Sequence, residues 1–87
     1  MNYYYIKKSD GACLKFRLSV TLETASFTGE SYHQVVAYVA HCYKQAVTGK
    51  WITMGRYDYH ETKNVHCCHN GREAADYVAD ELGLSRI

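Results

Sequence analysis

The stretch at residues 14–22, LKFRLSVTL, decides how the first half of this chain folds. In it, leucine, phenylalanine and valine alternate with lysine, arginine, serine and threonine. A period of two places successive side chains on opposite faces of a strand. The stretch therefore predicts a strand with one apolar face and one polar face.

Residues 3–8 precede this strand and are rich in tyrosine, which favours strands. Between the two segments, Ser9-Asp10-Gly11 has the composition of a three-residue hairpin loop with glycine in the left-handed position. A loop of that length places Tyr4 and Ile6 on the inner face with Phe16 and Leu14. The outer face then carries Tyr3, Tyr5 and Lys7 together with Cys13, Lys15 and Arg17.

Residues 28–49 have the spacing of an amphipathic helix. Thr28 is a suitable N-cap, Glu30 lies in the first turn, and Gly49 suits the position just past the C-terminus. Apolar residues recur every three or four positions from Tyr32 to Ala46. This segment is therefore predicted to be a helix that buries one apolar stripe.

A second pair of strands is predicted at residues 51–60 and 65–69, joined by the polar residues 61–64. Asn70 and Glu73 then have the spacing of a capping box that starts a closing helix. Gly83 is the residue expected to end it. The inner face of this helix is predicted to carry Ala75, Val78, Ala79 and Leu82.

A chain of 87 residues is predicted to form a single domain over residues 1–87. The expected order of elements is β-β-α-β-β-α, an α+β fold. It predicts a two-layer sandwich with a four-stranded, mostly antiparallel sheet and two helices on one face. The other face of the sheet would then be open for a partner or for self-association.

Composition limits the class of function. Hydrophobic residues make up 47% and charged residues 22%, which is typical of a globular protein, and the net charge of +1 argues against a polycation that binds phosphate non-specifically. We find no apolar run of about 18 residues and no secretory signal, so no membrane partner is expected. Four cysteines in such a chain are typical of reduced thiols, which predicts a cytoplasmic protein.

The run His66-Cys67-Cys68-His69 has four potential zinc ligands in succession. On a strand, alternate residues share a face, and the hairpin with residues 51–60 brings two further ligands to that face. The helix at 28–49 would add a cysteine. The predicted structural zinc ligands are Cys42, Cys67 and His69, completed by Asp58 or His60. The alternative is that the cysteines are small core residues and the histidines lie at strand ends.

The sequence favours binding over catalysis. Asp58, His60 and Glu61 could take part in acid–base chemistry, and Cys67 with a histidine could act as a nucleophile. No glycine-rich phosphate loop, Gly-x-Ser-x-Gly element or second carboxylate pair accompanies them. We therefore expect a protein that is not an enzyme.

The outer face of the first hairpin is the predicted partner-binding surface. Tyrosine and arginine are common anchors of protein contacts, and the same residues on a sheet could stack bases and hold the phosphates of single-stranded nucleic acid. The alternative without a binding role is a solvated sheet face with lysines at its edge. The predicted contact residues are Tyr3, Tyr5, Lys7, Lys15 and Arg17.

In its small size, its nine tyrosines and its lack of a catalytic signature, the chain resembles the small proteins that phages and mobile elements encode against host defences, including the anti-CRISPR proteins. The resemblance implies a non-catalytic inhibitor or adaptor that docks on a larger host protein or nucleoprotein complex, such as a host nuclease complex. The alternative is a small nucleic-acid-binding domain that uses the tyrosine and basic residues of the sheet.

Overall fold

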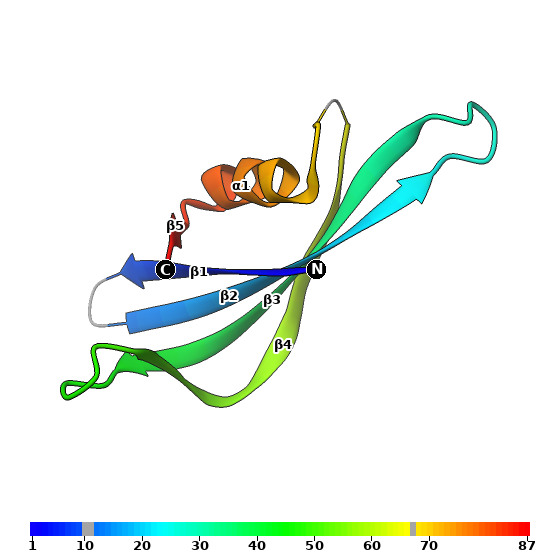
Figure 1. The fold of residues 1–87 in the computed structure, drawn as a ribbon. Coiled ribbons are helices and arrows are strands. Elements are labelled where there is room, and N and C mark those ends of the chain that lie inside the picture. Colours follow the sequence, from blue (N-terminus) through cyan, green and yellow to red (C-terminus); the bar gives the residue numbers. More distant parts are fainter. Residues whose placement is uncertain (10–11, 67) are drawn as a thin grey trace.

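The computed structural model describes residues 1–9, 12–66 and 68–87 (Figure 1). These residues form a five-stranded sheet with the order β4-β3-β2-β1-β5, in which all neighbours are antiparallel. One helix, α1, follows the fourth strand. The elements are β1 (Asn2–Ser9), β2 (Ala12–Thr24), β3 (Ser31–Lys44), β4 (Trp51–Val65), α1 (Gly71–Leu82) and β5 (Ser85–Arg86).

The predicted α+β sandwich with the order β-β-α-β-β-α is wrong. The described residues contain one helix rather than two, and the sheet has five strands rather than four. The error lies in residues 28–49, where the structure has the long strand β3 in place of the predicted helix.

Strand β3 lies between β2 and β4, and both of its faces are partly buried. Val35 and Ala37 are buried on one face, and Ala40 and Cys42 on the other. A strand that is apolar on both faces has apolar residues at nearly every position, so a helical spacing can be found within it. β-Branched and aromatic residues in this segment favour the strand.

The predicted helix caps are hairpin turns instead. The loops at residues 25–30 and 45–50 have the same pattern of hydrogen bonds: Gly29 N–H donates to Ala25 O at 2.9 Å, and Gly49 N–H donates to Gln45 O at 2.8 Å. Gly29 and Gly49 have φ of 70° and 71°, a left-handed conformation that favours glycine. Thr-Gly followed by a charged residue occurs in both turns, at residues 28–30 and 48–50.

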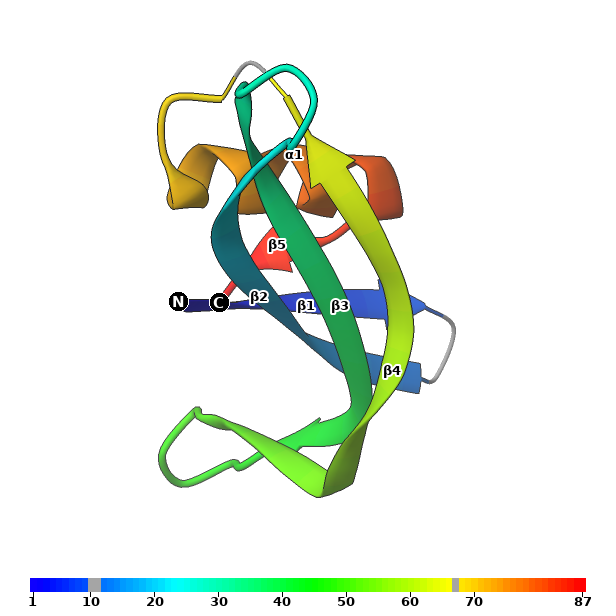
Figure 2. The same ribbon diagram turned by 90° about the vertical axis from the view of Figure 1, so that its right-hand side faces the viewer.

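The predicted hairpin at residues 51–69 is also wrong, because β4 continues through residues 61–64 and pairs with β3. Its polar residues fit an edge strand, where charges discourage pairing with another sheet. Two shifts in register interrupt the pairing, and Gly55, near the second, has φ of 76°. Such bulges bend a strand, and Figure 2 shows the bend in β4.

The predicted register of the first hairpin is wrong by one residue. Tyr5 pairs with Phe16 and Tyr4 with Arg17, whereas a three-residue loop predicts Tyr4 opposite Phe16. Because the side-chain period of a strand is two, this shift moves every side chain of β1 to the other face. The strand predicted at residues 14–22 is confirmed within β2.

The predicted closing helix is confirmed. Asn70 is the N-cap and its Oδ1 accepts from Glu73 N–H at 2.8 Å, while Gly83 ends the helix with φ of 72°. The buried face of α1 packs on one side of the sheet, and small residues allow the helix to lie close to the strands. The core contains Tyr5, Phe16, Leu18, Val20, Val35, Ala37, Val65, Ala74, Ala75, Val78, Ala79 and Leu84.

Helix α1 leaves the opposite side of the sheet uncovered (Figure 2). We call that side the open face, and the side that α1 covers the helix side. The molecule is elongated, with principal extents of 50 × 22 × 21 Å, and the turns at 25–30 and 45–50 lie at opposite ends of it (Figure 1). Within the part of the chain that the structure describes, no helix is long and apolar enough to cross a membrane.

Candidate binding surface

The open face concentrates cations and aromatic rings. Strand pairing places Lys15 and Arg17 of β2 beside Ala40 and Tyr38 of β3, on the side away from α1. Rings from β1, β3 and β4 surround these cations. The cation–aromatic face consists of Tyr4, Lys8, Lys15, Arg17, Tyr38, Lys44, Trp51, Tyr57 and Tyr59.

Arg17 is at the centre of this face. Its guanidinium carbon lies 4.7 Å from the ring centroid of Tyr38 and 4.8 Å from that of Tyr57. Tyr59 contacts Tyr38 edge to face at 6.3 Å between centroids. The Nε of Arg17 is buried without a hydrogen-bond partner among the described residues. Cation–π contact with two rings offsets part of the cost of burying that donor.

Three lysines continue the pattern toward one end of the face. Lys15 Nζ lies 5.2 Å from the Tyr4 centroid and donates a hydrogen bond to Trp51 O at 3.4 Å. Lys8 and Lys44 both approach the ring of Trp51, at 5.3 and 5.8 Å from its centroid. Trp51, the first residue of β4, therefore approaches the side chain of Lys8 on β1, although β3 and β2 lie between the two strands. The sheet curls toward its open face at this end.

The cations of the open face are not neutralised within the described chain. The ion pairs of residues 1–9, 12–66 and 68–87 involve His60, Lys63, Arg72 and Arg86, and none includes Lys8, Lys15, Arg17 or Lys44. These four side chains instead lie over aromatic rings. The face thus presents positive charge that an acidic surface of a partner could complement.

The predicted contact residues are divided between the two sides of the sheet. Lys15 and Arg17 lie on the open face as expected, whereas Tyr3, Tyr5 and Lys7 lie on the helix side. Tyr5 is only 1% exposed, and its hydroxyl donates to Asp76 Oδ1 at 2.7 Å. The sequence reasoning missed Tyr4, Lys8, Tyr38, Lys44 and Trp51 as members of the face. A two-residue loop in the first hairpin would have identified Tyr4, and a strand at 31–44 would have identified Tyr38.

The structure does not bring the predicted zinc ligands together. Cys42 lies on the open face, whereas Asp58 and His60 line a hollow on the helix side. His69 precedes α1 and is exposed, and Cys67 lies outside the described residues. Among residues 1–9, 12–66 and 68–87, no three histidine, cysteine or carboxylate side chains form a group that could hold a metal ion. Zinc binding that includes Cys67 stays a prediction.

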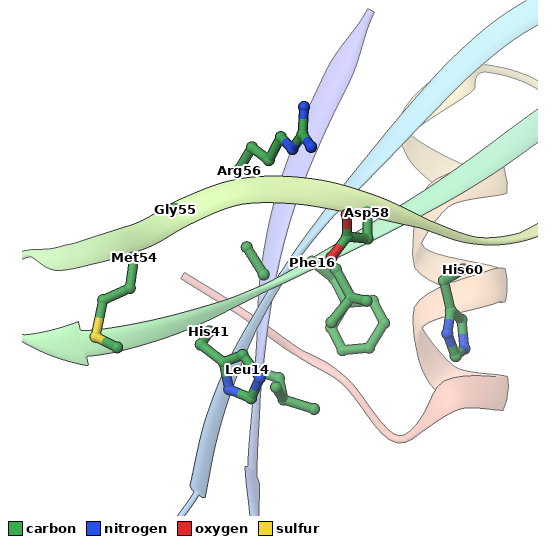
Figure 3. Close-up of a pocket in the computed structure, with 10 residues that line it drawn as sticks. Leu14, Phe16, His41, Met54, Gly55, Arg56, Asp58 and His60 are labelled. Carbon is green, nitrogen blue, oxygen red and sulfur yellow. The ribbon is translucent and has the colours of Figure 1, made fainter.

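The hollow on the helix side lies beyond α1 and has a volume of about 660 Å³ (Figure 3). Leu14, Phe16 and Val39 make its apolar lining, and the ring of Phe16 contacts that of His60 edge to face at 5.5 Å. The three extra residues that β4 inserts opposite β3 at its two register shifts shape the outer wall of the hollow. Within the described chain, Asp58 forms no hydrogen bond with His41 or His60, which line the same hollow. Its remaining lining residues are Ala40, His41, Met54, Gly55, Arg56, Asp58 and His60.

Cys13 and Cys42 face each other on β2 and β3. Their Sγ atoms are 2.7 Å apart, and both residues are free thiols. Burial, together with the hydrogen bond and charge of Cys13, raises the pKa of the Cys42 thiol to about 12. Cys42 therefore stays protonated at neutral pH, which slows its oxidation.

We expect the azo oxidant diamide to link these two cysteines in a Cys67→Ser/Cys68→Ser background. The two thiols lose their hydrogens to diamide, which becomes the hydrazine, and one S–S bond forms. Thiol titration and intact mass should show one internal disulfide per monomer, formed faster as the pH rises. The further change Cys42→Ser should abolish it. A disulfide-linked dimer as the main product would contradict the close pairing.

Comparisons of the chain with protein-family models, with curated proteins and with solved structures return no match.

Proposed function

We propose that this chain is a non-catalytic protein-binding inhibitor or adaptor that docks on an acidic surface of a larger protein through the cation–aromatic face. The observation that carries the proposal is that four cations share this face, lie over aromatic rings and form no ion pair within the described chain. We also propose that this binding takes place in the cytoplasm. A host nuclease complex, which the resemblance to anti-CRISPR proteins implies, is one such partner.

The position of the cations favours a protein over single-stranded nucleic acid. Stacking of a base requires a free ring face. Here Arg17 lies over Tyr38 and Tyr57, and lysines lie over Tyr4 and Trp51, so the protein's own cations occupy faces that bases would need. Arginine and tyrosine are also typical anchors of protein interfaces. The net charge of only +1 agrees with recognition by local complementarity.

The test is affinity capture from extract of the source cell with the wild-type chain and with a Lys15→Glu/Arg17→Glu variant. We expect the variant to lose a specific protein partner, with affinity reduced about tenfold or more when that partner is purified and titrated. The matched control is Lys7→Glu, since Lys7 is exposed and on the helix side of the neighbouring strand. This control should bind as the wild type does.

Two results would overturn the proposal. One is equal capture of the same partner by the wild type and by the double variant, with both shown to be folded by circular dichroism. The other is loss of capture after nuclease treatment, combined with binding to single-stranded RNA that weakens steeply with salt, which would instead support the nucleic-acid alternative. Because Arg17 is partly buried, its replacement could disturb folding. A second variant, Lys8→Glu/Lys15→Glu, tests the charge of the face and keeps Arg17.

A further inference from the structure

A second concave site lies at the end of the open face where the sheet curls. Residues of β1, β3, β4 and β5 surround a hollow of about 450 Å³. The two edge strands of the sheet, β4 and β5, both contribute to it. Its lining residues are Ile6, Lys8, Lys44, Trp51, Gly83, Ser85 and Arg86.

The lining of this edge hollow is cationic. Lys8 and Lys44 come from two different strands, and no carboxylate lines the hollow. Arg86 also lines it, but Arg86 pairs with Tyr5 and its side chain lies on the helix side. Arg86 is paired with Asp76 through its Nε and Nη2 atoms. Lys8 and Lys44 have no such partner among the described residues, although the Trp51 ring holds both ammonium groups within 6 Å of its centroid. Two cations that line one hollow and form no ion pair there attract an anion, and a bound anion would offset their mutual repulsion.

We propose that the edge hollow binds a phosphoryl group. A phosphate dianion supplies the charge to bridge two ammonium groups, and its several oxygens can accept hydrogen bonds from them together. The Ser85 hydroxyl and the Trp51 indole N–H are further donors in the lining, and neither has a partner in the described chain. The hollow shares Lys8, Lys44 and Trp51 with the cation–aromatic face but does not include Lys15 or Arg17. Phosphate binding by the Lys15→Glu/Arg17→Glu variant therefore tests the hollow separately from the proposed protein contact.

Trp51 makes the proposal simple to test, because it is the single tryptophan of the chain and lines the hollow. Its fluorescence should change saturably with inorganic phosphate and stay flat with sodium chloride at the same ionic strength. We expect half-saturation in the millimolar range. Lys8→Ala and Lys44→Ala should each raise the midpoint about tenfold. The matched control Lys7→Ala removes an exposed lysine from the adjacent position on the other side of β1 and should leave the midpoint unchanged.

The source of the phosphoryl group is distinguished by two further titrations. A phosphoserine peptide that binds at least tenfold more tightly than inorganic phosphate, with no binding of the unphosphorylated peptide, assigns the site to a phosphorylated protein. Equal midpoints for the peptide and for phosphate assign it to small phosphate esters. The proposal is overturned if chloride reproduces the response, or if Lys7→Ala shifts the midpoint as much as Lys8→Ala. Amide shifts of Ser85 and Arg86 in NMR spectra provide a readout independent of the fluorescence.

Discussion

Replacing Leu18 by alanine should lower the free energy of unfolding by about 3–5 kcal/mol. Leu18 is completely buried in the core between the sheet and α1. Truncation removes its buried surface and leaves a cavity that the neighbouring strands cannot fill without moving. A domain of this size is stable by only about 5–10 kcal/mol, so the variant should be close to unfolded at physiological temperature.

The measurement is urea unfolding followed by circular dichroism, and Leu22→Ala is the matched control. Leu22 lies on the same strand and the same side of the sheet but is 65% exposed. Its truncation should change the free energy of unfolding by less than about 0.5 kcal/mol. Equal losses for the two variants would show that α1 does not cover β2 at Leu18 in the way described.

The second large effect is expected at Asp76, which connects α1 to both β1 and β5. Its carboxylate accepts hydrogen bonds from the Tyr5 hydroxyl at 2.7 Å and from the Nε of Arg86 at 3.1 Å. Asp76→Ala leaves the hydroxyl of the buried Tyr5 without an acceptor and should cost about 2–3 kcal/mol. Asp76→Asn keeps an acceptor and should cost less. Asp80→Ala, one turn later on an exposed part of α1, is the control and should have little effect.

The same carboxylate makes stability depend on pH. The hydrogen bond from Arg86, opposed by burial and assisted by Tyr5, lowers the pKa of Asp76 in the folded state. A lowered folded pKa means that the contribution is fully present above the unfolded pKa of about 4 and is lost as the pH falls through the folded value. Urea midpoints measured from neutral to acid pH should therefore converge for wild type and Asp76→Asn at low pH. A constant difference between them would contradict this role of the charge.

The proposed contact and the edge hollow depend on how the sheet curls. Lys8 belongs to β1 and Lys44 to β3, and only the approach of Trp51 across the open face brings both to one ring. The net charge of +1 gave no sign of this local concentration of cations. On the helix side, Asp76 and Glu81 of α1 form ion pairs with Arg86 and Lys63, whereas Lys8 and Lys44 on the open face form none within the described chain.

Features that depend on neighbouring residues were predictable. The N-cap at Asn70 and the left-handed Gly83 need only local backbone geometry, and the structure has both. The second half of the predicted capping box differs, because the Glu73 carboxylate accepts from the backbone N–H of His69. The alternation in residues 14–22 needs only one covered face. The turns at 28–30 and 48–50 could also have been predicted, because the repeated Thr-Gly pair is consistent with two hairpin turns on either side of a strand.

Other features were decided by contacts between distant segments. Whether residues 31–44 form a helix or a strand depended on the presence of β2 and β4 on either side, since their apolar residues satisfy both patterns. The register of β1 depended on the length of the hairpin loop, where a difference of one residue moves every side chain to the other face. The observed register places Tyr5 under α1 and Tyr4 on the open face.

The sequence by itself therefore determined the amphipathic strand at residues 14–22 and the closing helix with its caps, because hydrophobic period and capping act over a few residues. Only the tertiary structure decided the rest of the sheet and the membership of its open face. Strand pairing joins residues far apart in the chain, and the face on which a side chain lies follows from a register that local preferences do not specify. Lys15 and Arg17 were recognised from their own strand, but the rings that hold Arg17 come from β3 and β4.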